Sequence, residues 1–399
     1  VSSTTDFAVV GAGIVGLATA MKLQQRFTDC TVRVVEAESR VSAHQSGHNS
    51  GVLHSGIYYQ PGSAKAICCR TGKAAMEEFC DQHQVAWDRC GKVVVATDSE
   101  ELPRLDRIAE RAAANGVEFQ RIDTDQLREL EPASAGIAAL HVPETGIVNY
   151  RAVCEAMAGV IRSRGGLVDL DFNVRKIERL SSSLRLCSDR QLSVDCGKMI
   201  NCGGLHSDRV CRLAGGNPTH RISPFRGEYY PLEDASASLC RNLIYPVPDP
   251  SFPFLGVHFT RMIEGGVECG PNAVFALSRT GYRWSDINLQ DLTSSLSFGG
   301  FRKLALKHWR MGAGEIHRSL SKAAFVKALQ KLIPSITRSD LKRGRAGVRA
   351  QAVTPEGALV DDFLVEETEL AIHVLNAPSP AATASLAIAD RIVDRVAAK

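Results

Sequence analysis

Three glycines near the N-terminus have the spacing of a phosphate-binding turn. They follow an apolar run over residues 7–10, and a second apolar run over residues 31–35 ends in Glu36. In a strand–turn–helix unit such glycines allow the tight turn, the close approach of a pyrophosphate and the packing of the helix on the strand. These glycines are Gly11, Gly13 and Gly16. Because Glu36 stands where ribose hydroxyls are bound, the sequence predicts a dinucleotide-binding unit rather than a tight turn without a ligand.

A polar loop over residues 43–61 carries further side chains that could hydrogen-bond a ligand. It is rich in glycine, serine, histidine and asparagine, so it is too polar for a core strand and too glycine-rich for a helix. His44 and His48 stand four residues apart, but the glycines around them argue against a shared helical face and against a metal-binding pair. His54 and Tyr59 follow at the end of the loop.

Twelve cysteines are spread along the chain, and none has the CxxC spacing of a metal or redox site. Most lie in apolar segments, which indicates small buried hydrophobic residues in a reducing compartment. No metal site is expected.

Length and composition are those of an ordinary soluble globular protein with two domains. The chain has 399 residues, of which 44% are hydrophobic and 23% charged. Helical spacing of apolar residues predicts helices over 63–82, 100–115, 124–132, 151–164 and 300–332, and after residue 383. Shorter apolar runs predict strands over 91–96, 167–170, 174–180, 198–202, 346–350, 359–365 and 370–375, with further strands within 222–272.

Seven strings along the chain carry a resemblance to a known family. They are residues 44–59, 224–229, 245–249, 252–260, 270–273, 346–351 and 376–383. With the interleaved elements, they resemble the D-amino-acid oxidase superfamily of FAD enzymes and, within it, the L-2-hydroxyglutarate dehydrogenase family, from about Phe7 to Ala389. The resemblance implies oxidation of L-2-hydroxyglutarate to 2-oxoglutarate, by removal of the C2 hydroxyl proton and hydride transfer to flavin N5.

The resemblance implies an α/β fold, in which a Rossmann-type FAD-binding domain is interleaved with a strand-rich α+β substrate domain. We assign residues 1–89, 151–218 and 341–399 to the FAD-binding domain. We assign residues 90–150 and 219–340 to the substrate-binding domain.

The resemblance also extends the FAD site beyond Gly11, Gly13, Gly16 and Glu36. The polar loop passes along the pyrophosphate towards the ring with Ser46, Gly47, Asn49, Ser50 and Gly51. Val174 resembles the adenine-contacting backbone of the family, and Gly203 and Gly204 let a strand end approach the cofactor. The C-terminal loop lies beneath the ring with Pro378, Ser379, Ala381, Ala382 and Thr383, where the dipole of the following helix stabilises the anionic reduced flavin.

Oxidation of a 2-hydroxy acid needs a cation for the carboxylate and a base for the hydroxyl proton. Arg349 is the predicted carboxylate ligand, because its guanidinium fork matches a carboxylate; the alternative is a surface arginine. His54 is the predicted base and His258 the second candidate, since only imidazole titrates unaided near neutral pH. Either histidine can instead serve only as a hydrogen-bonding group. Tyr59 is expected to hydrogen-bond the substrate, or else to be a core aromatic.

Positive charge is concentrated over residues 299–345, which contain twelve Lys and Arg residues and two acidic residues, a net charge of +10. Because the whole chain has a net charge of +3, the remaining residues have a net charge of −7. Within residues 301–311, apolar residues alternate with basic ones. Such a segment favours peripheral contact with an anionic membrane; the alternative is an ordinary helix packed on the second domain. No nucleic-acid partner is expected.

The expected electron acceptor is a quinone or carrier at the mitochondrial inner membrane, with oxygen as the alternative. In a bacterial source we expect the cytoplasm or the inner-membrane face instead.

Three other functions stay open at this point. An FAD-dependent oxidase of another 2-hydroxy or 2-amino acid would share the fold. A nicotinamide-dependent dehydrogenase fits only the first forty residues. A non-enzymatic flavin or nucleotide sensor would not need Arg349 and a histidine at the ring.

Overall fold

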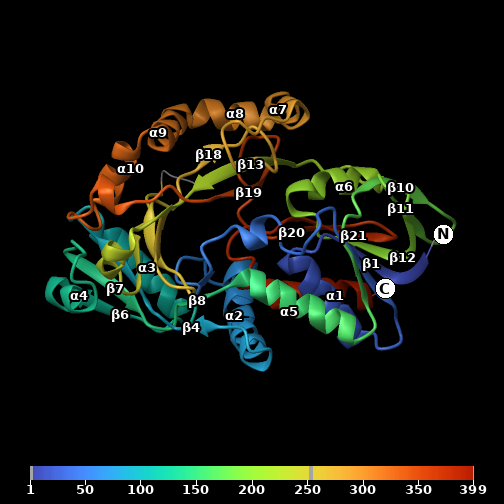
Figure 1. Ribbon diagram of the computed structural model, residues 1–399, viewed down its shortest axis with the longest axis horizontal. Coiled ribbons are helices and arrows are strands. Elements are labelled where there is room, and N and C mark those ends of the chain that lie inside the picture. The colour runs from blue at the N-terminus through green and yellow to red at the C-terminus, as the bar shows by residue number, and fades with distance from the viewer. Residues whose placement is uncertain (1–2, 251–254, 399) are drawn as a thin grey trace.

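A largely parallel sheet carries the glycine turn at the carboxyl end of its first strand. The computed structural model describes residues 3–250 and 255–398, so residues 252–254 of the string 252–260 lie outside the described residues. The strands of this sheet are β1 (Ser3–Val10), β2 (Val32–Val35), β9 (Leu167–Asp169), β10 (Val174–Arg179), β11 (Leu184–Ser188), β12 (Ser193–Asn201), β20 (Leu364–Glu367) and β21 (Ala371–Asn376). β1, β2, β9, β12 and β21 pair in parallel, and antiparallel pairing adds β10, β11 and β20. Figure 1 shows the sheet on the side where both chain termini lie.

β1 is buried on both faces, which is typical of a central parallel strand. Phe7 and Val9 belong to one hydrophobic cluster, and Ala8 and Val10 belong to another. The alternation of side chains along a strand explains this division.

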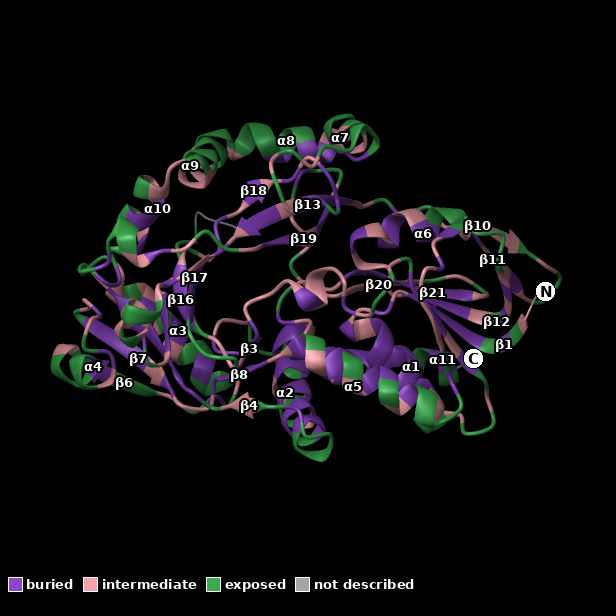
Figure 2. Ribbon diagram, in the orientation of Figure 1, coloured by how far each residue is buried: buried purple, intermediate pink, exposed green. Residues whose placement is uncertain are grey.

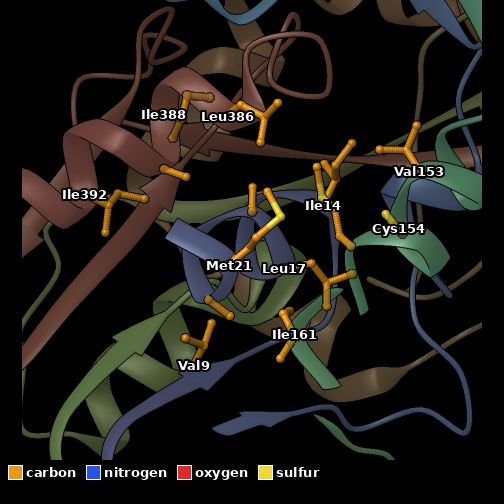
Figure 3. Close-up of a cluster of buried hydrophobic side chains, with 14 of the residues drawn as sticks. Val9, Ile14, Leu17, Met21, Val153, Cys154, Ile161, Leu386, Ile388 and Ile392 are labelled. Carbon is orange, nitrogen blue, oxygen red and sulfur yellow. The ribbon is translucent and has the colours of Figure 1, made fainter. Parts of the chain in front are cut away.

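The larger of these clusters joins helices from the start, middle and end of the chain. The helices are α1 (Ile14–Arg26), α2 (Ala64–Gln82), α5 (Tyr150–Ser163) and α11 (Ser385–Ala397). Figure 3 shows Leu17, Ile161 and Ile388, one each from α1, α5 and α11, within this cluster. Segments far apart in the sequence therefore share one core.

A mixed seven-stranded sheet lies on the other side of the molecule (Figure 1). In spatial order its strands are β14 (Tyr230–Pro231), β17 (Val267–Gly270), β16 (His258–Arg261), β15 (Leu243–Pro246), β5 (Lys92–Ala96), β7 (Ala138–Val142) and β6 (Gln120–Asp123). Two three-stranded sheets accompany it. One contains β18 (Val274–Phe275), β13 (Arg221–Glu228) and β19 (Ala346–Val353), and the other β3 (Val52–Leu53), β8 (Gly146–Val148) and β4 (Trp87–Asp88).

The remaining helices lie outside the first core. They are α3 (Leu102–Ala114), α4 (Thr124–Leu130), α6 (Ser207–Leu213), α7 (Leu289–Leu296), α8 (Gly299–Lys307), α9 (Trp309–Leu320) and α10 (Lys322–Leu329). The 3₁₀ turns are Gln45–Gly47, Gly204–His206, Asp234–Leu239 and Arg338–Asp340. α7 to α10 form an outer arc, and much of its surface is exposed (Figure 2). Among the described residues, no helix is long and apolar enough to cross a membrane.

The predicted fold class is confirmed, and the principal helices are found close to their predicted bounds. Two expectations are wrong. The loop over residues 43–61 contains a 3₁₀ turn and strand β3, because Val52 and Leu53 are buried and pair with β8. The strand expected over residues 359–365 begins only at Leu364, and Leu359 forms an isolated bridge with Val353.

All twelve cysteines are free, and nine of them are buried, so the prediction of small buried hydrophobic residues is confirmed. Within residues 3–250 and 255–398, no group of three or more His, Cys, Asp or Glu side chains could hold a metal ion.

The domain boundaries stay a prediction. Strands of the first sheet come from residues 3–35, 167–201 and 364–376, and those of the seven-stranded sheet from residues 92–142 and 230–270. β19, which the predicted division gives to the FAD-binding domain, pairs with β13 instead of joining the first sheet.

Candidate active site

One large cavity joins the glycine turn to the two candidate histidines. Its volume is about 1960 Å³, against roughly 300–1,000 Å³ for an ordinary ligand pocket. The predicted catalytic residues that line it are His54, Tyr59, His258 and Arg349. The predicted cofactor residues that line it are Gly11, Gly13, Gly16, Glu36, Ser46, Asn49, Ser50, Val174, Gly203, Gly204, Pro378, Ser379, Ala381, Ala382 and Thr383. Gly47 and Gly51, also predicted at the cofactor, do not line the cavity. The volume of the cavity suffices for a dinucleotide together with a substrate.

The three glycines of the turn are needed for different reasons. At Gly11 φ is +104°, and a Cβ would lie 2.5 Å from the carbonyl oxygen of Cys202. At Gly16 a Cβ would lie 2.0 Å from the carbonyl oxygen of Gly11. At Gly13 φ is −76°, and the one atom near its Cβ position is Ser46 Oγ at 3.3 Å. The fold therefore requires Gly11 and Gly16, whereas the absent side chain of Gly13 leaves space in the cavity.

The N-terminus of α1 offers backbone N–H groups to the cavity. Gly13 is the N-cap and supplies no side-chain cap, and the first turn contains no acidic residue. The Ile14 N–H donates to Ser46 Oγ at 2.9 Å, and Val15 and Gly16 line the cavity wall. Unpaired N–H groups and the helix dipole favour an anion here, so this end of the cavity fits a pyrophosphate.

Glu36 is fixed by two backbone hydrogen bonds. Its Oε2 accepts the N–H of Ala12 at 2.6 Å, and its Oε1 accepts the N–H of Glu38 at 3.0 Å. Burial raises the pKa of the Glu36 carboxyl, and the two hydrogen bonds oppose that shift. Because a carboxylate offers about four acceptor positions, Glu36 keeps capacity for ribose hydroxyls.

Asn49 uses its side chain to shape the polar loop. Its Nδ2 donates to the carbonyl oxygens of Gln45 and Ser46, at 3.0 and 2.8 Å, and its Oδ1 accepts the N–H of Gly51 at 2.8 Å. A Cβ on Gly47 would collide with the neighbouring backbone, 2.3 Å from a carbonyl oxygen. These residues position the loop, and Ser46 lies on its cavity side.

The end of the cavity near β10 and β12 contains Val174, expected at the adenine, and two glycines expected to let a strand end approach the cofactor. Val174 begins β10, and Gly203 and Gly204 follow β12. The Gly203 N–H donates to Asn201 Oδ1 at 3.0 Å, and Gly204 has φ of +50°. Gly203 and Gly204 lie at the carboxyl edge of the parallel strands, where α/β sheets bind ligands.

Thr383 ties the C-terminal loop to the segment that carries His54. Its Oγ1 accepts the backbone N–H of His54 at 3.1 Å and lies 3.2 Å from the carbonyl oxygen of Val52. The hydroxyl of Tyr150 lies 2.9 Å from the same Oγ1. α11 then begins at Ser385, and its N-cap Ala384 supplies no side-chain cap, so its N-terminus offers N–H groups near the cavity-lining loop.

The ring nitrogens of His54 make no hydrogen bond within the described part of the chain, so they are available to a ligand. Burial lowers the pKa of His54 to about 3, and the charges of Lys92, His258 and Lys65 act in the same direction. The ring is therefore neutral near pH 7 and has a lone pair with which to accept a proton.

His258 is held in one tautomer. Its Nδ1 lies 2.8 Å from the carbonyl oxygen of Gly256, and because a carbonyl can only accept, Nδ1 carries the proton and Nε2 is the acceptor. Its ring centre lies 3.9 Å from that of Tyr245, with the two ring planes tilted by 31°. Burial lowers the pKa of His258 to about 3; the Gly256 hydrogen bond opposes this shift, and the charge of Arg349 adds to it.

Arg349 and Tyr59 complete the set of predicted catalytic residues in the cavity. Arg349 lies on β19 and hydrogen-bonds Tyr229. The Tyr59 hydroxyl hydrogen-bonds Ser379 of the C-terminal loop, and burial raises its pKa well above 10.

Several cavity residues were not predicted as site residues. The tyrosines are Tyr58, Tyr229 and Tyr245, and Lys65 also lines the wall. Lys92 is buried behind them, with its Nζ 5.1 and 4.5 Å from the ring centres of Tyr58 and Tyr245. Arg104, Arg107 and Arg111 of α3 line the cavity as well. Their spacing on one helix face could have been noticed, whereas the burial of a lysine depends on contacts that the sequence does not reveal.

Comparison with known proteins gives consistent results. The model of the FAD dependent oxidoreductase family matches residues 6–395. An L-2-hydroxyglutarate dehydrogenase from Indibacter alkaliphilus is 48% identical over 97% of this chain and 97% of its own. The one from Escherichia coli K12 is 44% identical over 98% of this chain and 93% of its own. The one from Bos taurus, named as mitochondrial, is 42% identical over 99% of this chain and 89% of its own.

Solved structures share the fold at low sequence identity. An L-alpha-glycerophosphate oxidase from Mycoplasma pneumoniae with FAD bound has a TM-score of 0.80 at 19% identity, covering 98% of this chain and 94% of its own. A glycine oxidase from Geobacillus kaustophilus has a TM-score of 0.75 at 18% identity, covering 100% and 96%.

Two glycine substitutions should separate cofactor binding from folding. Gly13→Ala should leave the stability of the apoprotein within about 1 kcal/mol, because its backbone is ordinary and its Cβ meets only Ser46 Oγ. The new methyl group should raise the Kd for FAD by roughly tenfold or more. Gly16→Ala should destabilise the apoprotein itself, because its Cβ overlaps the Gly11 carbonyl. Urea denaturation measures the stability of each apoprotein, and FAD titration measures each Kd. Equal loss of stability in the two variants would contradict this interpretation.

Proposed function

We propose that this chain, which belongs to the FAD-dependent oxidoreductase family and within it to the L-2-hydroxyglutarate dehydrogenases, oxidises L-2-hydroxyglutarate to 2-oxoglutarate. One observation carries the proposal. A cavity that begins at a dinucleotide-binding turn also contains Arg349 and two neutral histidines. These are the groups that oxidation of a 2-hydroxy acid requires.

The residues present fit FAD. The start of α1, whose N-cap Gly13 has no side chain, and the space beside Gly13 would hold the pyrophosphate, and Glu36 would hold the adenosine ribose. The start of α11, with the loop before it, would face the pyrimidine edge of the ring. When bound, FAD supplies the acceptor for the hydride that leaves C2.

Arg349 binds the substrate carboxylate next to the reacting carbon in this proposal. A guanidinium holds a carboxylate through two parallel hydrogen bonds, which also fixes its orientation. Its interaction with Tyr229 restrains the side chain, and its effect on His258 supports a position beside that ring.

His54 is our first candidate for the base that accepts the C2 hydroxyl proton. Its ring nitrogens make no hydrogen bond to any described residue, and its backbone N–H donates to Thr383 of the loop expected beneath the flavin. His258 is the second candidate, because its hydrogen bond to Gly256 leaves Nε2 as the acceptor.

The substrate assignment predicts a stereospecific reaction. With the FAD-loaded protein under anaerobic conditions, L-2-hydroxyglutarate should bleach the yellow absorbance of oxidised flavin. D-2-hydroxyglutarate and L-glutamate should leave it unchanged at the same concentration. Bleaching by the D enantiomer alone, or by the 2-amino acid alone, would contradict the proposal, and the latter would indicate an amino-acid oxidase.

Substitution of the histidines should identify the base. His54→Ala should lower the rate of flavin reduction by roughly 10²–10⁴-fold with FAD still bound, whereas Arg349→Ala should mainly raise the substrate Kd. His141→Ala, at a histidine on β7 that does not line the cavity, is the control. Stopped-flow absorbance measures each step. A His54→Ala variant that reduces its flavin at a near-normal rate would assign the role to His258.

We further propose that the outer arc contacts an anionic membrane and that electrons pass there to a quinone or carrier. On α8 and α9, Leu306 and Trp309 are 75% and 62% exposed. The basic side chains around them are exposed too, namely Arg302, Lys303, Lys307 and Arg310. Phe301 and Leu304, expected to share this surface, are buried, because they pack inward. A mitochondrial location in an animal source, or the inner-membrane face in a bacterium, would accord with this role.

Liposome flotation tests the membrane surface. The variant with Glu at Lys303, Lys307 and Arg310 should lose flotation with anionic vesicles at low salt, because each nearby cation contributes about 1 kcal/mol to binding. A matched control places Glu at the exposed Lys176, Arg179 and Arg190 on and near β10. Equal recovery of all proteins in the soluble fraction would identify the arc as ordinary scaffold.

A further inference from the structure

Lys65 is a buried cation in the cavity wall. It is the second residue of α2, it lines the cavity, and only 8% of it is exposed. Its Nζ lies 5.1 Å from the ring centre of Tyr59. Lysine is almost never buried unless it is paired, so a buried ammonium at this position needs an anionic partner.

Among the described residues Lys65 has one ion-pair partner, and it is poorly suited to balance the burial of the ammonium. Nζ lies 3.0 Å from Oδ1 of Asp361, whose side chain is 96% exposed. An ion pair with a solvated carboxylate contributes little to stability. An ammonium has three donors, and within the described residues that of Lys65 uses one. Two N–H donors are left for an acceptor in the cavity.

Lys65 and Arg349 act on different histidines. Lys65 is close enough to His54 to lower its pKa, and Arg349 does the same to His258, while His258 also acts on His54. Both cations and both histidines line the same cavity. A five-carbon diacid that gives one carboxylate to Arg349 carries its second carboxylate past the reacting carbon.

Lys92, Arg107 and Arg111 are less suited to that second carboxylate. Lys92 does not line the cavity, because Tyr58 and Tyr245 cover its ammonium. Arg107 and Arg111 of α3 line it but are exposed, and exposed charges are screened by solvent and salt. Lys65 combines burial, free donors and a place on the wall.

We propose that Lys65 binds the substrate carboxylate remote from the reacting carbon and so sets the preference for a dicarboxylic 2-hydroxy acid. This inference rests on the proposed function and adds a specificity-determining residue to it. When no diacid is bound, the carboxylate of Asp361 is the group paired with the Lys65 ammonium. The Asp361 carboxylate and the remote carboxylate of the substrate then compete for the same positive charge.

Two substitutions test the inference in the FAD-loaded protein. Lys65→Met keeps the length and apolar stem of the side chain and removes its charge. It should lower the ratio of glutarate to butyrate affinity, measured by titration of the flavin spectrum, by about 10- to 100-fold. The ratio of kcat/KM for L-2-hydroxyglutarate over L-2-hydroxybutyrate should fall similarly, and Lys65→Arg should restore part of both. Asp361→Asn removes the competing carboxylate and should leave the glutarate preference unchanged or increase it.

The controls distinguish recognition from a structural role. Lys73 is a buried lysine of the same helix, paired with Glu77 at 2.6 Å and absent from the cavity wall. Lys73→Met should lower thermal stability and leave the glutarate-to-butyrate ratio as it is. If Lys65 only fastens the segment of Asp361 to α2, Lys65→Met and Asp361→Asn will weaken both ligands alike, which would overturn the inference. Failure of the proposed function gives a different result. In that case L-2-hydroxyglutarate would not bleach the flavin of the unaltered protein, whatever the preference of that protein for glutarate over butyrate.

Discussion

The hydroxyl of Thr383 joins the three parts of the chain on which the site depends. It lies within 3.2 Å of the Val52 carbonyl oxygen, the His54 N–H and the Tyr150 hydroxyl. Residue 383 thus holds the strand before the candidate base, the start of α5 and the entrance to α11 in one buried network. Tyr150 also donates to the Val52 carbonyl oxygen at 3.0 Å, so loss of the Thr383 hydroxyl would mainly leave the His54 N–H without its acceptor. The distance between His54 and the C-terminal loop is therefore set by the fold rather than by the ligand.

Burial governs the electrostatics of the cavity. It lowers the pKa of both His54 and His258 to about 3 and that of Lys92 to about 8. Uncharged histidines beside fixed cations make a wall that attracts anions and contains lone pairs for a proton. The aromatic ring of Tyr59 faces the ammonium of Lys65, and those of Tyr58 and Tyr245 face the ammonium of Lys92, and these contacts help to stabilise both charges.

Local patterns predicted the parts of the site that depend on local geometry. The glycine turn, Glu36 and the helices over residues 63–82 and 151–164 follow from spacing within one segment. Thr383 was expected to face the cofactor, and the sequence could not reveal that its hydroxyl binds partners more than two hundred residues away. The buried Lys65 and Lys92 were missed for the same reason, since a helix or strand pattern does not show what covers a lysine. The strand at Val52 was missed because two residues make too short an apolar run to recognise.

The charges of the proposed substrate complete this arrangement. A histidine with a pKa near 3 is a weak proton acceptor, and the cations beside it are part of the cause. Two carboxylates that bind Arg349 and Lys65 would offset those cations and add negative charge next to the rings, and both effects raise the pKa of a histidine. Binding of the diacid and strengthening of the base are then the same event. A monoacid would leave one cation uncompensated, so the base beside it would stay weaker. In this view the second carboxylate contributes to the proton transfer as well as to recognition.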